Sequence, residues 1–534
     1  MIRYLIESGT VIDGSGAEPR EINIGIHNDR IVYAGSERVA AERTVNARGL
    51  IVAPGFIDTH SHSEFTILAD GRAEGKLSQG ITTEINGNCG LSAAPLFGEA
   101  LIRRQADMDE LGITLRWSNF QEYFALLRRK GIAINFATLC GHGNIRGSVI
   151  GYRNSAADGS DMAEMKRLLS DAVAAGAKGL STGLIYPPGI YSDTSELTAL
   201  ARALKSPSDL QGTRATALPF QGVYASHMRS EGDALIESIQ EMLEIGRGAG
   251  APIHISHLKT AGERNWWKID NALSLIANAQ SEGINITCDR YPYVAASTDL
   301  DTILPSWVYE GGVEEELARL KKPETAARIK SDISRKDDNY WKGVYISSVV
   351  NPENSWMEGE NIFDIASKTG KNIVEALLEL LIHERTRTGA IFFSMSENNL
   401  RRFMSLPFLM IGSDSAVRSF SGPTCSGKPH PRGFGSFPRF VGRYVRDEGL
   451  VTLPEAIRRT TALPAATFGL ANRGTIREGA YADIVIFNYE RIIDTATFRE
   501  PFSRPEGIEY VFVNGGMAVD GGEITGILSG TVLS

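Results

Sequence analysis

The sequence predicts an α/β protein whose centre is a (β/α)8 TIM-like barrel and whose two ends together form a small β domain. The middle of the chain alternates short apolar runs with helical patterns, the order expected of parallel strands joined by helices. The two ends instead share a texture of short strands and turns. With 534 residues the chain can bury a sizeable core. We place the β domain in residues 1–52 and 471–534 and the barrel in residues 53–470.

Eight apolar runs qualify as barrel strands, because each is short and ends in polar or ligand-capable residues. They occupy residues 55–62, 81–90, 134–144, 179–184, 223–228, 253–259, 284–293 and 409–414. Helical patterns follow several of them, for example at residues 161–177 and 233–250. A ninth run, AIFFSMSE at 390–397, means that the count could differ by one. Residues 304–387 are too many for an ordinary loop, so we expect a helical insertion near the barrel mouth.

Composition and charge favour a small-molecule partner. The chain is 42% hydrophobic and 22% charged, which is ordinary for a globular protein. Its net charge of -9 argues against nucleic acid or an anionic membrane as partner. No run offers the ~20 apolar residues of a membrane span, and the first residues resemble a strand and turn rather than a signal peptide.

Cysteine usage predicts a reducing, cytoplasmic location, because the four cysteines are too few for a disulfide framework. In that compartment an unusual cysteine is more often a ligand or a nucleophile than half of a bridge. We expect a monomer or a small homo-oligomer.

Histidines and an aspartate gather at the ends of the predicted strands. His60 and His62 share one strand face, because side chains two apart in a strand point the same way. His227 and His257 end two later runs, and Asp414 ends the last. The carboxyl ends of barrel strands meet at one mouth, so these residues together predict a metal site, although each alone would more simply be structural.

The chain resembles the amidohydrolase superfamily and, within it, the N-acyl-D-amino-acid deacylases, or D-aminoacylases. The likeness runs over nearly the whole length, through APGFIDTHSH, NGNCG, GLSTGLIYPP, SHMRSEGD, ISHLK, IGSD and HPRGFGSFPR. The resemblance implies a metal-dependent (β/α)8 barrel beside a small β-sandwich made from both ends of the chain. The implied reaction is hydrolysis of the amide bond of an N-acyl-D-amino acid.

By this resemblance Cys89, His227 and His257 hold one tight Zn²⁺. His60, His62 and Asp414 would form a second, weaker site, with Cys89 as a bridge between the two. Other members of the superfamily use a carboxylated lysine on the fourth strand instead. Lys178 precedes that strand here, so we interpret it as a solvated lysine. His254 is assigned to the core or to contacts behind the ligands.

The resemblance also implies roles around the metal. Asp414 would act as general base and then as general acid, and Tyr186 could be an extra donor. A substrate carboxylate requires fixed cations and hydroxyls, for which we select Lys259, Tyr291 and Arg432, with Ser297 and Thr298 nearby. Arg290 and Arg418 could each reach an acidic substrate side chain. His142 and His430 are given local hydrogen-bonding roles.

Two alternatives remain open from the sequence. A cyclic amidohydrolase of hydantoinase or dihydroorotase type would share the metal chemistry but more often carries the lysine ligand. A metal-bound scaffold without catalysis would require Asp414 to be dispensable.

Overall fold

The centre of the computed structural model is a closed barrel of eight parallel strands; the structure describes residues 2–204, 222–333 and 336–534. The strands are β8 (Phe56–Asp58), β9 (Ile81–Asn86), β10 (Asn135–Thr138) continued by β11 (Cys140–Gly141), β12 (Gly179–Gly183), β13 (Val223–His227), β14 (Ile253–Ile255), β15 (Ile286–Arg290) and β19 (Leu409–Ile411). Neighbours pair in parallel throughout, and a parallel bridge from Ser61 to Ser415 joins the last strand to the first. The predicted fold class is confirmed, with the eight predicted runs as its strands.

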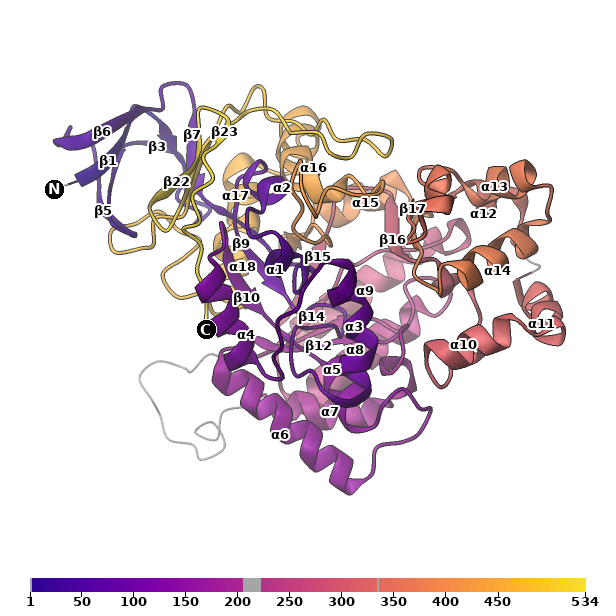
Figure 1. Ribbon diagram of the computed structural model, residues 1–534. Helices are drawn as coiled ribbons and strands as arrows, with labels where there is room; N and C mark the ends of the chain where they lie inside the picture. The colour runs from indigo at the N-terminus through magenta and orange to yellow at the C-terminus, as the bar shows by residue number, and fades with distance from the viewer. Residues whose placement is uncertain (1, 205–221, 334–335) are drawn as a thin grey trace.

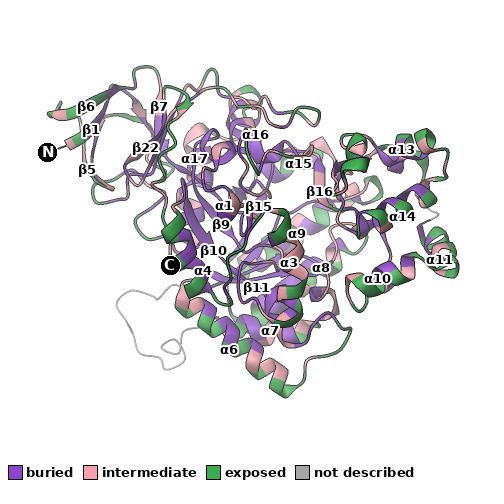
Figure 2. Ribbon diagram, viewed as in Figure 1, coloured by how far each residue is buried: buried purple, intermediate pink, exposed green. Residues whose placement is uncertain are grey.

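Helices surround the barrel and supply its outer wall (Figure 1). Those after the barrel strands are α1 (Thr66–Ala69), α2 (Glu74–Leu77), α3 (Gly98–Glu110), α4 (Phe120–Lys130), α5 (His142–Val149), α6 (Gly159–Ala175), α7 (Thr194–Arg202), α8 (Leu235–Ala249), α9 (Ile269–Ser281), α16 (Arg432–Arg439), α17 (Leu453–Thr460) and α18 (Ala462–Thr467). Helix α6 illustrates how local sequence defines these helices. Asp158 and Asp161 make a capping box at its start, and Gly176 ends it in a left-handed conformation. Its buried residues follow helical spacing, and its outer face is exposed (Figure 2).

Strands from both ends of the chain build the β-sandwich. One sheet has the order β5-β4-β1-β6, from β5 (Arg30–Gly35), β4 (Asn23–His27), β1 (Ile2–Glu7) and β6 (Ala41–Asn46). The other has the order β23-β22-β21-β20-β7-β2-β3 and mixes β2 (Thr10–Val11), β3 (Arg20–Glu21) and β7 (Ile51–Pro54) with β20 (Ile484–Phe487), β21 (Ile508–Val513), β22 (Gly516–Asp520) and β23 (Glu523–Ile524). The domain boundaries at 52/53 and 470/471 remain a proposal.

The insertion is mainly helical, as predicted, but it also contains a sheet that the sequence did not predict. Its helices include α10 (Val313–Leu320), α11 (Pro323–Ile333), α12 (Asp338–Lys342), α13 (Ile362–Thr369) and α14 (Ile373–His383), which lie together on one side of the molecule in Figure 1. The sheet has the order β16-β18-β17, from β16 (Ala295–Asp299), β18 (Gly389–Phe393) and β17 (Val344–Ser348). The ninth apolar run is therefore β18 of the insertion, followed by helix α15 (Glu397–Met404), and not a barrel strand.

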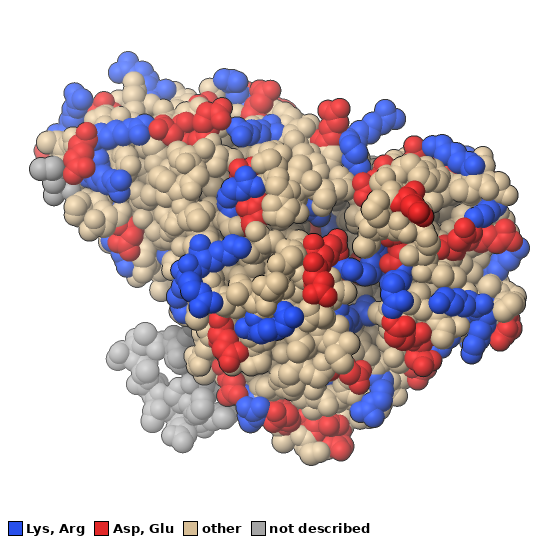
Figure 3. All heavy atoms as spheres, viewed as in Figure 1, with Lys and Arg blue, Asp and Glu red and all other residues tan. Residues whose placement is uncertain are grey.

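The surface carries both signs of charge. Figure 3 shows Lys and Arg interspersed with Asp and Glu on the face in view. None of the helices in the described ranges has the length and apolar character needed to cross a bilayer.

Candidate metal centre

Six of the predicted site residues come from the carboxyl ends of five barrel strands. His60 and His62 follow β8, Cys89 follows β9, and His227 is the last residue of β13. His257 and Asp414 follow β14 and β19 by two and three residues. The barrel therefore brings together at one mouth side chains that are up to 354 positions apart, from His60 to Asp414.

The donor atoms of these residues lie within a few ångströms of one another. Cys89 Sγ is 3.2 Å from His60 Nε2 and 3.4 Å from His257 Nε2. The ring of His227 is 4.4 Å from that of His257, measured between centroids. Asp414 Oδ1 lies 3.2 Å from His62 Nε2 and 3.6 Å from His60 Nε2. These atoms form three groups that could each hold a metal ion: His60 with Cys89 and His257, His60 with His62 and Asp414, and His227 with Glu231 and His257. The group that contains Cys89 shares one histidine with each of the others.

These residues fit a metal ion. Both ring nitrogens of His227 are buried without a hydrogen-bond partner, and so is Nδ1 of His62. Buried polar nitrogens are rarely left unpaired, and a cation would satisfy them. Thiolate sulfur with imidazole nitrogen is a donor set that suits Zn²⁺.

The backbone is strained at three of the candidate ligands. Cys89, His257 and Asp414 have φ values of 53°, 36° and 50°, although none is glycine. This left-handed conformation is unfavourable by roughly 1–2 kcal/mol per non-glycine residue and concentrates at functional sites. Around Cys89, Gly87 makes room: a Cβ there would lie 2.1 Å from the Leu139 carbonyl oxygen.

Electrostatics favour the ionised thiol and carboxylate. Burial alone would raise the pKa of Cys89, but the neighbouring imidazoles of His60 and His257 hold it well below its usual range. Burial also opposes ionisation of Asp414, yet Arg432, whose Nη1 is 2.8 Å from Oδ2, and His60 keep its pKa well below normal. Burial lowers the pKa of His62, but hydrogen bonds to Asp414 and Cys89 outweigh it and raise the value to about 9. A divalent cation would replace the imidazole protons in this cluster.

Two carboxylates in contact with the ligands, the half-buried Glu231 and the buried Asp289, are absent from the predicted site. Glu231 Oε1 is 2.7 Å from His257 Nδ1 and also contacts Lys259. Asp289 is 3.0 Å from His60 Nδ1, 2.8 Å from His254 Nε2, and accepts the backbone N–H of His257. Glu231 lies in the motif SHMRSEGD, and Asp289 lies in the predicted strand at residues 284–293.

The remaining histidines make local contacts, in line with the roles assigned to them. His254 is buried between Asp289 and Thr287. His142 Nε2 is 2.8 Å from Glu196, and His430 Nε2 is 2.9 Å from the Ala295 carbonyl oxygen. Lys178 is half-buried, directly before β12 and thus at the end of the strand opposite the metal centre.

A cavity of about 350 Å³ opens above the metal centre. All five predicted substrate-binding residues line it: Tyr186, Lys259, Tyr291, Ser297 and Arg432. Arg432 Nη2 donates to the Ser297 carbonyl oxygen at 3.1 Å, and the Tyr186 hydroxyl lies 2.8 Å from Thr298 Oγ1. The Tyr291 hydroxyl is buried without a partner.

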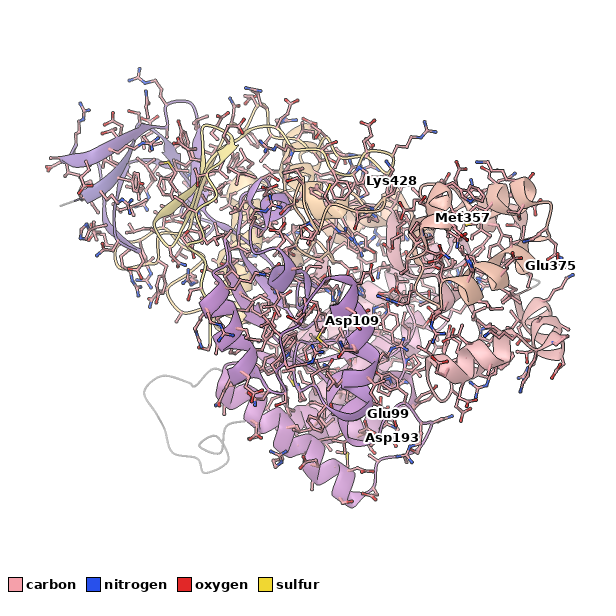
Figure 4. The ribbon with its side chains drawn as sticks, viewed as in Figure 1. Glu99, Asp109, Asp193, Met357, Glu375 and Lys428 are labelled. Carbon is pink, nitrogen blue, oxygen red and sulfur yellow. The ribbon has the colours of Figure 1, made fainter. Side chains whose placement is uncertain are left out.

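The two arginines suggested for an acidic side chain do not line this cavity. Arg290 is buried and donates to the Tyr293 carbonyl oxygen, and Arg418 donates to the carbonyls of Thr424 and Ser426. Arg290 makes this contact through Nη2 only, and its Nε and Nη1 are buried without a hydrogen-bond partner. Arg103 and Arg104 line the cavity instead. They belong to α3, whose two ends are marked by Glu99 and Asp109 in Figure 4.

Comparison with known proteins gives matches along nearly the whole chain. A profile of the amidohydrolase family matches residues 43–278 and 382–519. D-aminoacylase of Alcaligenes xylosoxydans xylosoxydans is 34% identical over 531 residues, 99% of this chain and 97% of the relative. N-acyl-D-glutamate deacylase of the same organism is 37% identical over 517 residues, 96% and 92% of the two chains.

A solved structure agrees with these matches. The crystal structure of N-acyl-D-glutamate deacylase from Bordetella bronchiseptica contains zinc and a phosphonate inhibitor that mimics the tetrahedral intermediate of the reaction. It matches this chain with a TM-score of 0.81 and 33% identity, over 100% of this chain and 99% of the other.

Proposed function

Because the chain belongs to the amidohydrolase family, we propose that it hydrolyses the amide bond of N-acyl-D-amino acids, releasing a carboxylate and a free D-amino acid. One observation carries the proposal. A cluster of sulfur, imidazole and carboxylate donors lies at the floor of a cavity whose wall holds Lys259 and Arg432. Such a cavity can bind a carboxylate beside a hydrolytic centre.

The proposed cofactor is Zn²⁺. Cys89, His227 and His257 would hold one ion tightly, and His60, His62 and Asp414 would hold a second more weakly. When bound, Zn²⁺ supplies Lewis acidity, which makes water nucleophilic at neutral pH and polarises a carbonyl group.

Asp414 is the proposed proton carrier. Its carboxylate lies inside the cavity, and Arg432 and the histidines keep it ionised, so it can accept a proton from water. The protonated carboxyl can then deliver that proton to the departing nitrogen. Asp414 also belongs to the group formed with His60 and His62, so a second metal ion bound by this group would compete with proton transfer by Asp414.

Lys259, Tyr291 and Arg432 are proposed to bind the substrate carboxylate. The guanidinium of Arg432 lies 4.6 Å from the ring centroid of Tyr291, so the two side chains face the same part of the cavity. Lys259 is held by Glu231, which fixes the direction of its ammonium group. Arginine and lysine together can fix a carboxylate and exclude water from the reacting amide.

The position of Lys178 disfavours the cyclic amidohydrolase alternative. A lysine ligand would have to lie at the carboxyl end of β12, whereas Lys178 precedes Gly179 at its other end. Cys89 provides the anionic ligand instead.

The test is a substrate panel with the zinc-loaded full-length protein. Release of acetate from N-acetyl-D-amino acids, lost with a chelator and restored by Zn²⁺, is the expected result. Ring opening of hydantoins without acyl cleavage would favour the cyclic alternative, and a lack of turnover on all of them would favour the scaffold.

Asp414→Asn provides the mechanistic test. We expect the variant to retain the tightly bound metal by elemental analysis while kcat falls about 10²–10⁴-fold, because a proton-transfer group is lost. Turnover within a few fold of the parent would remove Asp414 as general base.

A further inference from the structure

A small recess of about 30 Å³ adjoins the substrate cavity on the side of the insertion. The two share Tyr152, Tyr186 and Asp299 in their walls, so a ligand in the cavity borders the recess. The far wall of the recess comes from the insertion and includes Asp301 and Glu316.

Glu316 is buried without any polar partner among the described residues. Glu316 is only 3% exposed, and its Oε1 has no hydrogen-bond partner. Asp301 is 8% exposed and receives only the backbone N–H of Thr302. Within the described ranges, no Lys, Arg or His nitrogen lies within 4.0 Å of these two carboxylates or of Asp299.

This arrangement differs from that of other buried carboxylates in the described parts of the chain. Asp58 is paired with Lys76, Glu196 with Arg146, and Asp483 with Arg473. The remaining buried carboxylates accept hydrogen bonds or ion pairs as well. An unpaired buried carboxylate is unfavourable by several kcal/mol unless it is neutralised or receives a cation. Burial accordingly raises the pKa of Glu316 to about 7.

The recess has the chemistry of a cation site. Three carboxylates line it against one guanidinium, that of Arg103, which leaves an excess of two acidic groups. Three tyrosines, Tyr152, Tyr186 and Tyr309, complete the wall. Aromatic faces attract ammonium and guanidinium groups, and carboxylates accept their hydrogen bonds.

We propose that this recess binds a cationic group of the substrate, an ammonium or guanidinium distal to the scissile amide. The inference rests on the proposed deacylase function and specifies its substrate class. The cation could be carried by the amino-acid side chain or by the acyl group, and the experiment separates the two.

The experiment compares kcat/KM for matched pairs on the zinc-loaded, full-length protein. N-acetyl-D-lysine against N-acetyl-D-norleucine tests a cation on the side chain. N-(6-aminohexanoyl)-D-norleucine against N-hexanoyl-D-norleucine tests one on the acyl group. We expect the cationic member of one pair to exceed the neutral member by about tenfold or more, the worth of a hydrogen-bonded charge.

Variants assign the preference to the recess. Glu316→Gln should lower the cationic preference about tenfold while leaving turnover of the neutral member within twofold. Glu315→Gln, on the exposed face of the same helix, should change neither value. If Glu316→Gln does not fold, Asp301→Asn takes its place.

The outcomes distinguish the two claims. Hydrolysis of the neutral substrates without a preference for either cationic partner would overturn the recess but not the deacylase. If none of the four substrates is hydrolysed, both the deacylase function and the recess are overturned.

Discussion

His257 is held at both of its ring nitrogens. Glu231 lies 2.7 Å from Nδ1, while Nε2 faces Cys89 at 3.4 Å. A carboxylate on one nitrogen fixes the proton there and leaves the other free to bind a metal. Glu231 also contacts Lys259, so one side chain orients both a proposed ligand and a proposed substrate contact.

Glu231→Gln should therefore weaken metal binding, although Cys89, His227 and His257 all remain in place. Because contacts behind metal ligands typically contribute 10–100-fold in affinity, we expect a decrease of about that size, measured by competition with a chromophoric chelator. Asp233→Asn is the control, because that aspartate pairs with Arg264 at the exposed surface. Equal metal affinity in parent and Glu231→Gln would show that Glu231 does not orient His257.

The sequence revealed the donor atoms of the site but not the residues that orient them. His60, His227 and Asp414 could be selected because strand ends converge in a barrel, whereas Cys89 was selected by the resemblance to the deacylases. Glu231 and Asp289 could not, since a carboxylate near a strand end is usually solvated. Asp289 lies within β15 and Glu231 follows β13 by four residues, and their histidine partners come from other strands of the barrel.

The junction between β8 and β19 is held by backbone and side-chain hydrogen bonds together. The backbone N–H groups of Thr59 and Asp414 donate to the carbonyl oxygens of Ile411 at 3.4 Å and His60 at 2.8 Å. Lys76 Nζ, on α2, donates to Asp58 at 2.6 Å, Ser61 at 2.8 Å and Ser413 at 2.9 Å. Lys76 is fully buried. His60 and Asp414 follow the two strands that Lys76 joins, so the Lys76 contacts and the backbone bond from Asp414 to His60 together set the spacing of these two residues.

Lys76→Met should impair catalysis beyond its effect on stability. Removing one partner of a buried ion pair destabilises by about 3–5 kcal/mol, and displacement of Asp414 should lower kcat about 10–100-fold with KM unchanged. Arg473→Met is the matched control: it also removes the cation of a buried ion pair, but one with Asp483 next to the sandwich strand β20. A similar fall in kcat for both variants, measured alongside urea unfolding, would refute a specific role for Lys76.

Helices α5 and α7 are joined by an ion pair that makes stability depend on pH. Burial opposes ionisation of Glu196, but His142 and Arg146 lower its pKa below the usual value. Because the pKa of Glu196 is lower in the folded state, its ionised carboxylate stabilises the fold fully above the ordinary glutamate pKa near 4. This stabilisation is lost as the pH falls through the pKa of the folded state. Glu196→Gln should therefore be less stable by roughly 3 kcal/mol at pH 7, with a smaller difference from the parent at pH 3–4 in urea titrations. A pH-independent difference would contradict this assignment.

The positions of helices and strands along the chain were more predictable from the sequence than the pairing of the strands. The helices predicted at 161–177 and 233–250 match α6 and α8 closely, because local spacing and caps define them. The run at 390–397 has the composition of a buried strand, and only its antiparallel pairing with β16 and β17 shows that it belongs to the insertion. The pairing of β18 with β16 depends on contacts between positions far apart in the sequence, such as Asp299 and Gly389, which local patterns do not encode.

Strand β20 joins the sandwich to the barrel because both of its faces are buried. Ile484 and Ile486 pack in the sandwich core, while Val485 and Phe487 pack in the barrel core. Next to it, Asp483 accepts hydrogen bonds from Asn135 of barrel strand β10 at 3.1 Å and from the backbone of Asn514 at 2.8 Å, and pairs with the buried Arg473. The alternating side chains of β20 and the carboxylate of Asp483 thus connect the sandwich core with the barrel core. We expect the sandwich and the barrel to unfold as one unit.

Asp483→Asn should make the unfolding of the sandwich less tightly coupled to that of the barrel. The substitution leaves Arg473, whose side chain is 3% exposed, without its counter-ion, and should be destabilising by about 3 kcal/mol. Calorimetry should show one transition for the parent and a lower, broader or divided transition for the variant. Asp520→Asn removes an ion pair with Arg43 at the outer, exposed end of the sandwich and should shift stability by less than about 1 kcal/mol. A sharp single transition at the parental temperature in Asp483→Asn would show that the apolar faces of β20, and not this polar network, couple the sandwich to the barrel.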